Sequence, residues 1–362
     1  MSSLESGSAR GRYSRMAARS KAPLPVRAAI ACVLAGACSA ALIYAAERVQ
    51  QRRAGHSWLI DGWSGTGATV YDPLLGWTSP PATHWPDYYG PGDHCTFNAR
   101  GFRALEEYAD APPKGRVRVL VLGDSFAFGL GVGDDDTFPA QLERRHPRVQ
   151  AVNLAKSSYG LDQAVLRYER DASGMDADIV LLAVIDDDLN RSRSDHFNGY
   201  RPKPRFRVVD GGELQLTGTP VPNFSGPITG PIMFLRRSAL FLIARQYLAE
   251  SFRKQDDVTL TLGILGRLRR LADERSHEVA LAYLPTISEL HSDELLPLAA
   301  LLEQYANQNS VPFVQTASAF DGLDAEGIDE CFLEVNGHYS ARGNGLVAEA
   351  LAAALGLDDP AW

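Results

Sequence analysis

Short apolar runs alternate with amphipathic stretches along the chain, from about residue 117 to residue 356. The runs are rich in β-branched residues, which is typical of strands buried on both faces. The stretches between them repeat apolar residues every three or four positions, as helices do. Strands that alternate with helices indicate a doubly wound parallel sheet with right-handed crossovers. The expected strands are residues 119–122, 149–154, 178–185, 279–284 and 311–314.

Helices are expected between these strands. Pro147 ends the first of them, because proline cannot continue a helix. Ser340 is a suitable cap for the last one, which stops at Gly356. The sequence thus predicts an α/β domain over residues 115–358, with helix layers on both faces of a mostly parallel sheet. The expected helices are residues 137–146, 161–172, 258–271, 295–305 and 340–356.

Residues 190–256 interrupt the alternation and are expected to form an insertion. Residues 206–209 and 214–216 show the pattern of a hairpin around a glycine turn. An apolar helix over Ile232–Phe252 follows, and its charge-free core is far too short to span a membrane. We expect this helix to pack on the sheet. The alternative is a lid over a substrate or a surface that touches lipid.

Residues 47–114 are rich in glycine, proline and aromatic residues and show no helical period. A disordered linker seldom carries so many aromatic residues. We therefore expect an irregular segment that packs on the main domain.

An uncharged apolar stretch, residues 28–46, follows a basic segment, residues 1–27. Its 19 residues suffice to cross a bilayer as a helix. The excess of basic residues places residues 1–27 in the cytoplasm and the body outside. We expect a single-pass transmembrane signal anchor in a bacterial inner membrane, with the body in the periplasm. A cleaved signal peptide and a lipidated Cys38 are the alternatives, and both also export the body.

Charge is distributed unevenly along the chain. The net charge is −8 over 362 residues, and residues 1–27 carry +5, which leaves −13 for the remainder. A body this acidic argues against nucleic acid as a partner.

Two cysteines, Cys95 and Cys331, lie in the exported part of the chain, where disulfides persist. They form either one disulfide or two free buried thiols.

A serine stands at the carboxyl end of the first expected strand. Gly123-Asp124-Ser125 ends the apolar run, and ligands bind at this edge of open α/β sheets. Ser125 is a candidate nucleophile if a base lies within its reach. Gly-Asp-Ser alone is a common turn, so this interpretation depends on the polar blocks near the other strands.

Three further polar blocks lie at the ends of expected elements: after the second strand, after the third strand and just before the last helix. They are Asn153–Gly160, Asp186–Leu189 and Asn336–Ser340. With the serine block, their order and content resemble the SGNH (GDSL-type) hydrolase superfamily over residues 70–356. Tyr71–Trp77 and Asn98–Arg103 look like segments of its membrane-anchored bacterial members. The resemblance implies a flavodoxin-like, three-layer fold and serine hydrolase chemistry. No cofactor and no metal is expected.

The resemblance also implies a role for each matched residue. Ser125 matches the nucleophile, and His338 matches the general base that takes its proton. Backbone N–H groups of Ser125 and Gly160, with a side chain of the third block, would form the oxyanion hole. The matching side chain in the third block is Asp187.

Two positions depart from the family pattern. The family has an asparagine amide where this chain has Asp187, and an ionised carboxylate cannot donate a hydrogen bond. Either burial among its neighbours keeps Asp187 neutral, or Asp187 is not the donor. In the family, the acid that orients the histidine stands two or three positions before it. Here these positions hold Asn336 and Val335, which are not acids. Asn336 itself, or Glu334 or Asp329 nearby, would have to orient the ring.

These features predict an exported serine esterase that removes small acyl groups from an envelope glycan or lipid. An O-acyltransferase uses the same acyl-serine chemistry, with a sugar hydroxyl in place of water. The departures at Asp187 and Asn336 keep a third class open, a catalytically impaired binding protein on this fold. A metal-dependent phosphohydrolase is disfavoured, because His338 is the only evident histidine partner for the acidic block.

Overall fold

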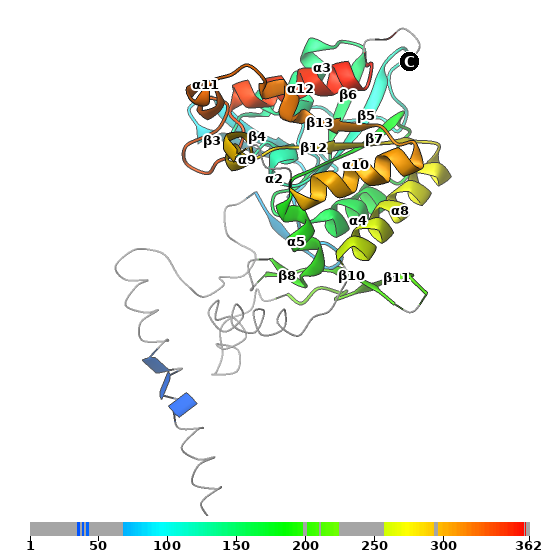
Figure 1. Cartoon of the computed structure of the whole chain (residues 1–362). Coiled ribbons are helices and arrows are strands. Elements are labelled where there is room, and N and C mark those ends of the chain that lie inside the picture. Colours follow the sequence, from blue (N-terminus) through cyan, green and yellow to red (C-terminus); the bar gives the residue numbers. More distant parts are fainter. Residues whose placement is uncertain are drawn as a thin grey trace, which may run out of the picture.

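A five-stranded parallel sheet forms the centre of the protein, in the order β13-β12-β7-β5-β6 (Figure 1). The structure is a computed structural model. It describes residues 35–36, 38–39, 41–42, 68–197, 201–209, 211–223, 257–292, 296–357 and 359. The prediction of an α/β fold with a parallel sheet is confirmed. The central strands are β5 (Val117–Gly123), β6 (Val149–Asn153), β7 (Ile179–Val184), β12 (Glu278–Tyr283) and β13 (Phe313–Gln315).

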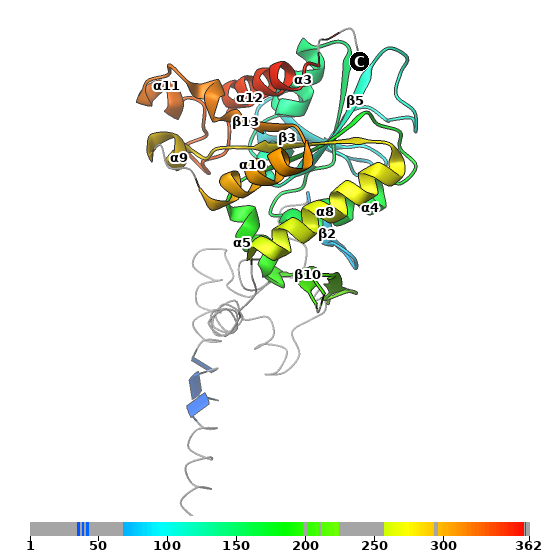
Figure 2. The same ribbon diagram turned by 45° about the vertical axis from the view of Figure 1, so that its right-hand side comes forward.

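Helices cover both faces of this sheet and give three layers (Figures 1 and 2). One face carries α3 (Phe138–Arg145) and α12 (Ala341–Ala354). The opposite face carries α4 (Leu161–Asp171), α8 (Asp257–Arg275) and α10 (Pro297–Asn309). As predicted, Ser340 caps the last helix, because its side chain accepts a hydrogen bond from Gly343 N.

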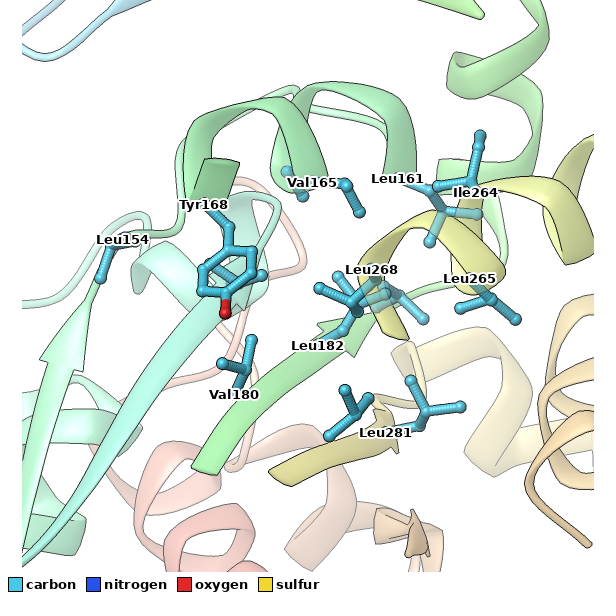
Figure 3. Close-up of a cluster of buried hydrophobic side chains, with 14 of the residues drawn as sticks. Leu154, Leu161, Val165, Tyr168, Val180, Leu182, Ile264, Leu265, Leu268 and Leu281 are labelled. Atoms are coloured by element: carbon cyan, nitrogen blue, oxygen red, sulfur yellow. The ribbon is translucent and has the colours of Figure 1, made fainter. Parts of the chain in front are cut away.

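Two hydrophobic cores lie between the layers, and β5 contributes to both. Successive strand residues point to opposite faces. Leu120 and Leu122 accordingly join the core under α4 and α8, whereas Val119 and Val121 join the core under α3 and α12. Figure 3 shows the first core, where side chains of α4 and α8 meet those of β7 and β12. A strand buried on both faces reads as a continuous apolar run, and this is why the sequence reveals it.

Residues 68–97 contain two antiparallel hairpins. Their aromatic side chains pack on the sheet domain. The indole N–H of Trp77 donates to Ser157 O at 3.1 Å, and the Tyr159 hydroxyl donates to Trp77 O at 2.6 Å. The hairpin strands are β1 (Val70–Asp72), β2 (Gly76–Thr78), β3 (Thr83–Gly90) and β4 (Asp93–Phe97).

The insertion contains the predicted hairpin, which pairs Phe206 with Leu216. Its strands are β10 (Arg205–Val208) and β11 (Leu214–Thr217), preceded by β8 (His196–Phe197) and β9 (Arg201–Pro202). The apolar helix expected over residues 232–252 lies outside the described residues, as does all of residues 28–46 except three pairs of positions. No helix in the described ranges combines the length and the apolar character needed to cross a membrane.

The remaining helices are short, and most follow the carboxyl ends of the central strands. They are α2 (Ser125–Phe128), α5 (Asp187–Arg193), α9 (Ile287–Ser292), α11 (Ala325–Asp329) and the 3₁₀ helices η1 (Asp134–Asp136) and η2 (Thr316–Phe320).

The candidate disulfide between Cys95 and Cys331 is absent, because both residues are buried free thiols. Cys331 Sγ donates to Gly327 O at 3.2 Å, within its own helical turn. Cys95 lies in β4, where it pairs with Trp85. Burial raises the pKa of both thiols, so they behave as small apolar core residues.

Candidate active site

Ser125 is the first residue of the short helix α2, directly after β5. Asp124 caps this helix, because its Oδ1 accepts a hydrogen bond from Phe126 N at 2.8 Å. Gly123 makes the turn possible with a φ of +153°, a value that side chains rarely tolerate. The Ser125 hydroxyl therefore stands at the carboxyl edge of the sheet, at the amino end of a helix.

Gly123→Ala is expected to destabilise the fold by about 3 kcal/mol. An added Cβ would lie 2.1 Å from the Ala183 carbonyl oxygen and 2.8 Å from Ala127 Cβ. Urea denaturation measures the change. Gly266→Ala is the control, since α8 has room for this methyl group and helices favour alanine over glycine. Equal stability of the two variants would contradict the role assigned to Gly123.

His338 meets Ser125 although 213 positions separate them in the chain. Its Nε2 lies 2.8 Å from Ser125 Oγ. Its Nδ1 lies 3.1 Å from the main-chain oxygen of Asn336. A carbonyl oxygen only accepts, so Nδ1 carries the proton and Nε2 is free to accept one from the serine. The Phe126 ring packs on the imidazole at a centroid distance of 4.7 Å and helps to fix its plane.

The electrostatic environment keeps this histidine neutral near pH 7. Burial lowers the pKa of His338 below its ordinary value of 6.5, while the charge of Asp124 acts in the opposite direction. A neutral imidazole is the form that can act as a base.

Two backbone amides that the sequence marks as candidate oxyanion donors are available to donate. Within the described residues, neither Ser125 N nor Gly160 N has a hydrogen-bond acceptor. Gly160 is the N-cap of α4, so the positive end of that helix dipole adds to its amide. A Cβ on Gly160 would lie 2.9 Å from Ser192 N and 3.0 Å from Arg191 Cβ, and this close packing excludes a side chain there.

Asp187 is not a donor, which corrects the expectation drawn from the third polar block. Its side chain is 59% exposed, and its carboxylate accepts a hydrogen bond from Arg191 Nη2 at 3.0 Å. A carboxylate paired with a guanidinium is ionised and only accepts.

The three residues that were candidates for orienting His338 differ in their contacts. Asn336 contacts the ring through its main-chain oxygen and not through its side chain. Asp329 accepts a hydrogen bond from His291 Nε2 at 2.8 Å and is engaged there. Glu334 is exposed and has no hydrogen-bond or ion-pair partner in the described part of the chain. A carbonyl thus holds the position that an acid occupies in the serine protease triad.

Two arginines with little exposed surface contact the backbone or side chains of the serine turn. Neither arginine was singled out from the sequence. Arg103 donates to the carbonyl oxygens of Phe128, at 2.8 Å, and Gly129, which end helix α2. Arg191 pairs with Asp124 at 2.8 Å. Arg103 belongs to the Asn98–Arg103 block, so a sequence signal existed for it. No motif marks Arg191.

A cavity of about 420 Å³ adjoins the histidine loop at the ends of β12 and β13. Pro285 and Phe320 line the cavity, and both contact Tyr339, the residue after His338. The Tyr339 hydroxyl donates to Pro285 O at 2.7 Å, and the Tyr339 ring stacks on the Phe320 ring. The described lining is about equally polar and apolar, and it includes the carboxylates of Glu289 and Asp321 but no Lys or Arg. It therefore suits a neutral ligand better than an anionic one. No group of three or more metal-binding side chains occurs among the described residues.

No protein-family profile matches the sequence, and no curated protein matches it. Solved structures do resemble it. A member of the lipolytic G-D-S-L family from Veillonella parvula aligns at 12% identity and a TM-score of 0.41, covering 66% of this chain and 97% of its own. An α/β hydrolase from the metagenome of Lake Arreo aligns at 15% identity and a TM-score of 0.41, and the alignment covers 67% of this chain and 96% of the hydrolase. An acetylxylan esterase from Geobacillus stearothermophilus aligns at 15% identity and a TM-score of 0.38, and the alignment covers 66% of this chain and 94% of the esterase.

These TM-scores are all below 0.5, and the identities are all below 25%. The function proposed below therefore stands on the geometry of Ser125, His338 and the two free amides.

Proposed function

We propose that the protein is a serine esterase, with Ser125 as nucleophile and His338 as general base. The observation that carries this proposal is the 2.8 Å contact between Ser125 Oγ and His338 Nε2. A serine hydroxyl is a weak nucleophile until a base takes its proton, and the tetrahedral oxyanion needs donors aimed at it. This arrangement supplies both.

In the proposed acylation step, Ser125 Oγ attacks the ester carbonyl carbon while its proton moves to His338 Nε2. The carbonyl electron pair moves onto oxygen, which the N–H groups of Ser125 and Gly160 bind. The intermediate then collapses, the bond to the alcohol breaks, and His338 gives its proton to the departing alkoxide. Water attacks the acyl-serine in the same way, which releases the acid and restores the Ser125 hydroxyl.

The proposed substrates are neutral acyl esters of an envelope glycan or lipid. The cavity next to the histidine loop carries the carboxylates of Glu289 and Asp321 and no Lys or Arg in its described lining, which disfavours anionic acyl groups. The basic residues 1–27 and the apolar stretch 28–46 support a membrane anchor with this domain in the periplasm.

The proposal is tested by labelling the full chain with a fluorophosphonate probe and by hydrolysis of p-nitrophenyl acetate. We expect covalent labelling that maps to Ser125, together with turnover of the ester. A folded protein that shows neither labelling nor turnover would instead support a binding protein.

The pH profile of kcat/KM should report the protonation of His338. Activity requires the neutral imidazole, so kcat/KM rises with pH through the pKa of His338. Burial lowers this pKa, so the midpoint is expected below 6.5 and the profile should be flat by about pH 7. Initial rates with p-nitrophenyl acetate, measured at the isosbestic wavelength of p-nitrophenol, check this. A midpoint at pH 7 or above would contradict it.

A further inference from the structure

A buried cluster of opposite charges lies directly behind the catalytic serine. Arg191, in α5, donates through Nη1 to Asp124 Oδ2 and to Asp188 Oδ1, each at 2.8 Å. Both carboxylates are buried, and only 14% of the arginine side chain is exposed. A buried charge is stable only when it is paired. Burial and the charge of Asp124 raise the pKa of Asp188 well above its ordinary range, so the charge that Arg191 chiefly pairs with is that of Asp124.

One of these acids also contacts the nucleophile. Ser125 Oγ lies 3.2 Å from Asp124 Oδ2, the same oxygen that Arg191 contacts. The hydroxyl carries a single proton, which it donates either to Asp124 or to His338. Donation to Asp124 is unproductive, because the proton then lies away from the base. A negative Asp124 beside Ser125 would also repel the oxyanion that forms during attack.

We propose that Arg191 is a positioning residue of this site, which neutralises Asp124 and thereby leaves the Ser125 proton to His338. The inference rests on the proposed esterase function. The two hydrogen bonds through Asp124 Oδ2 measure 2.8 and 3.2 Å, so Arg191 Nη1 lies within about 6 Å of Ser125 Oγ. At that distance one unit charge in a partly buried site changes a rate by about 10²-fold.

The surroundings of Arg191 fix its guanidinium in this place. Nη1 also lies 3.3 Å from Tyr159 O, next to the oxyanion-hole residue Gly160. Nη2 pairs with Asp187, and the guanidinium lies over the Phe197 ring at 5.8 Å.

The experiment is a double-mutant cycle on kcat and KM for p-nitrophenyl acetate, with wild type, Arg191→Met, Asp124→Asn and the double variant. Arg191→Met should lower kcat by about 10²-fold and change KM by less than about threefold. In the Asp124→Asn background the same substitution should lower kcat by less than about fivefold, because residue 124 then carries no charge beside Ser125 to be neutralised. An equal loss in both backgrounds would overturn the proposal.

Two further variants keep the test decisive. If Arg191→Met does not fold, Arg191→Met combined with Asp188→Asn leaves only one buried acid unpaired and should show the same loss of kcat. Arg118→Met removes another buried arginine, at the opposite end of β5, and should lower stability while kcat stays within about twofold. A 10²-fold loss of kcat in Arg118→Met would overturn the proposal.

The cycle also separates this proposal from the esterase function itself. If Ser125→Ala hydrolyses the ester at the wild-type rate, the proposed function fails. If Ser125→Ala is inactive and Arg191→Met has the wild-type kcat, only the role of Arg191 is overturned.

Discussion

Ser125→Ala is expected to lower kcat for p-nitrophenyl acetate by about 10⁴-fold or more and to abolish fluorophosphonate labelling. Alanine removes the hydroxyl that contacts His338 Nε2, so no acyl-enzyme forms. The two free amides remain, and the residual rate should be the small part that a preformed oxyanion hole gives on its own. Stability should change little, because within the described part of the chain the hydroxyl bonds only to Asp124 and His338.

Ser79→Ala is the matched control for this variant. Ser79 is also a buried serine, and its hydroxyl has no hydrogen-bond partner among the described residues. Its kcat and its labelling should equal those of the wild type. Labelling that persists in Ser125→Ala but disappears in Ser79→Ala would place the nucleophile elsewhere and remove the basis of the mechanism.

The central sheet was predictable because each strand is marked by its own run of apolar residues. Each of its five strands begins and ends within two residues of the expected range. β5, β6 and β7 are buried throughout, and β12 is buried after Glu278, so their apolar runs are visible without knowledge of their neighbours in the sheet. The hairpin strands β1–β4 were missed because most residues of β3 are at least partly exposed, and their glycine and proline content hides the pairing. Helix α5 begins with acids and has only Asp188 and Ser192 buried, so it gives little apolar signal.

The candidate site was predictable in its motifs but not in its supporting contacts. Ser125, Gly160 and His338 stand in blocks whose order is visible in the sequence, and the structure brings Ser125 and His338 into contact. The orienting group for His338 is a main-chain oxygen, which every residue possesses and no sequence can single out. Arg191 is 66 positions from Ser125, and only the packing of α5 against the serine turn places its charge beside Asp124.

His338→Gln is expected to lower kcat by about 10⁴-fold or more, with KM nearly unchanged. Glutamine has similar reach and can still contact the serine hydroxyl, but it cannot take its proton at neutral pH. Fluorophosphonate labelling should slow in parallel, since it also needs an activated Ser125. Unlike the wild type, the variant should lose the rise of kcat/KM with pH between about 5 and 7, because the titrating group is gone.

Asn336→Ala distinguishes orientation by the main chain from orientation by a side chain. The carbonyl oxygen that holds His338 Nδ1 survives this substitution, while the side-chain contact to His338 N is lost. We therefore expect kcat to fall by less than about tenfold, against about 10⁴-fold when a serine protease loses its orienting acid. A loss in Asn336→Ala as large as that in His338→Gln would show that the amide side chain orients the ring. A small loss means that the carbonyl suffices, so the pair works without an acid as long as the 334–338 loop holds its backbone in place.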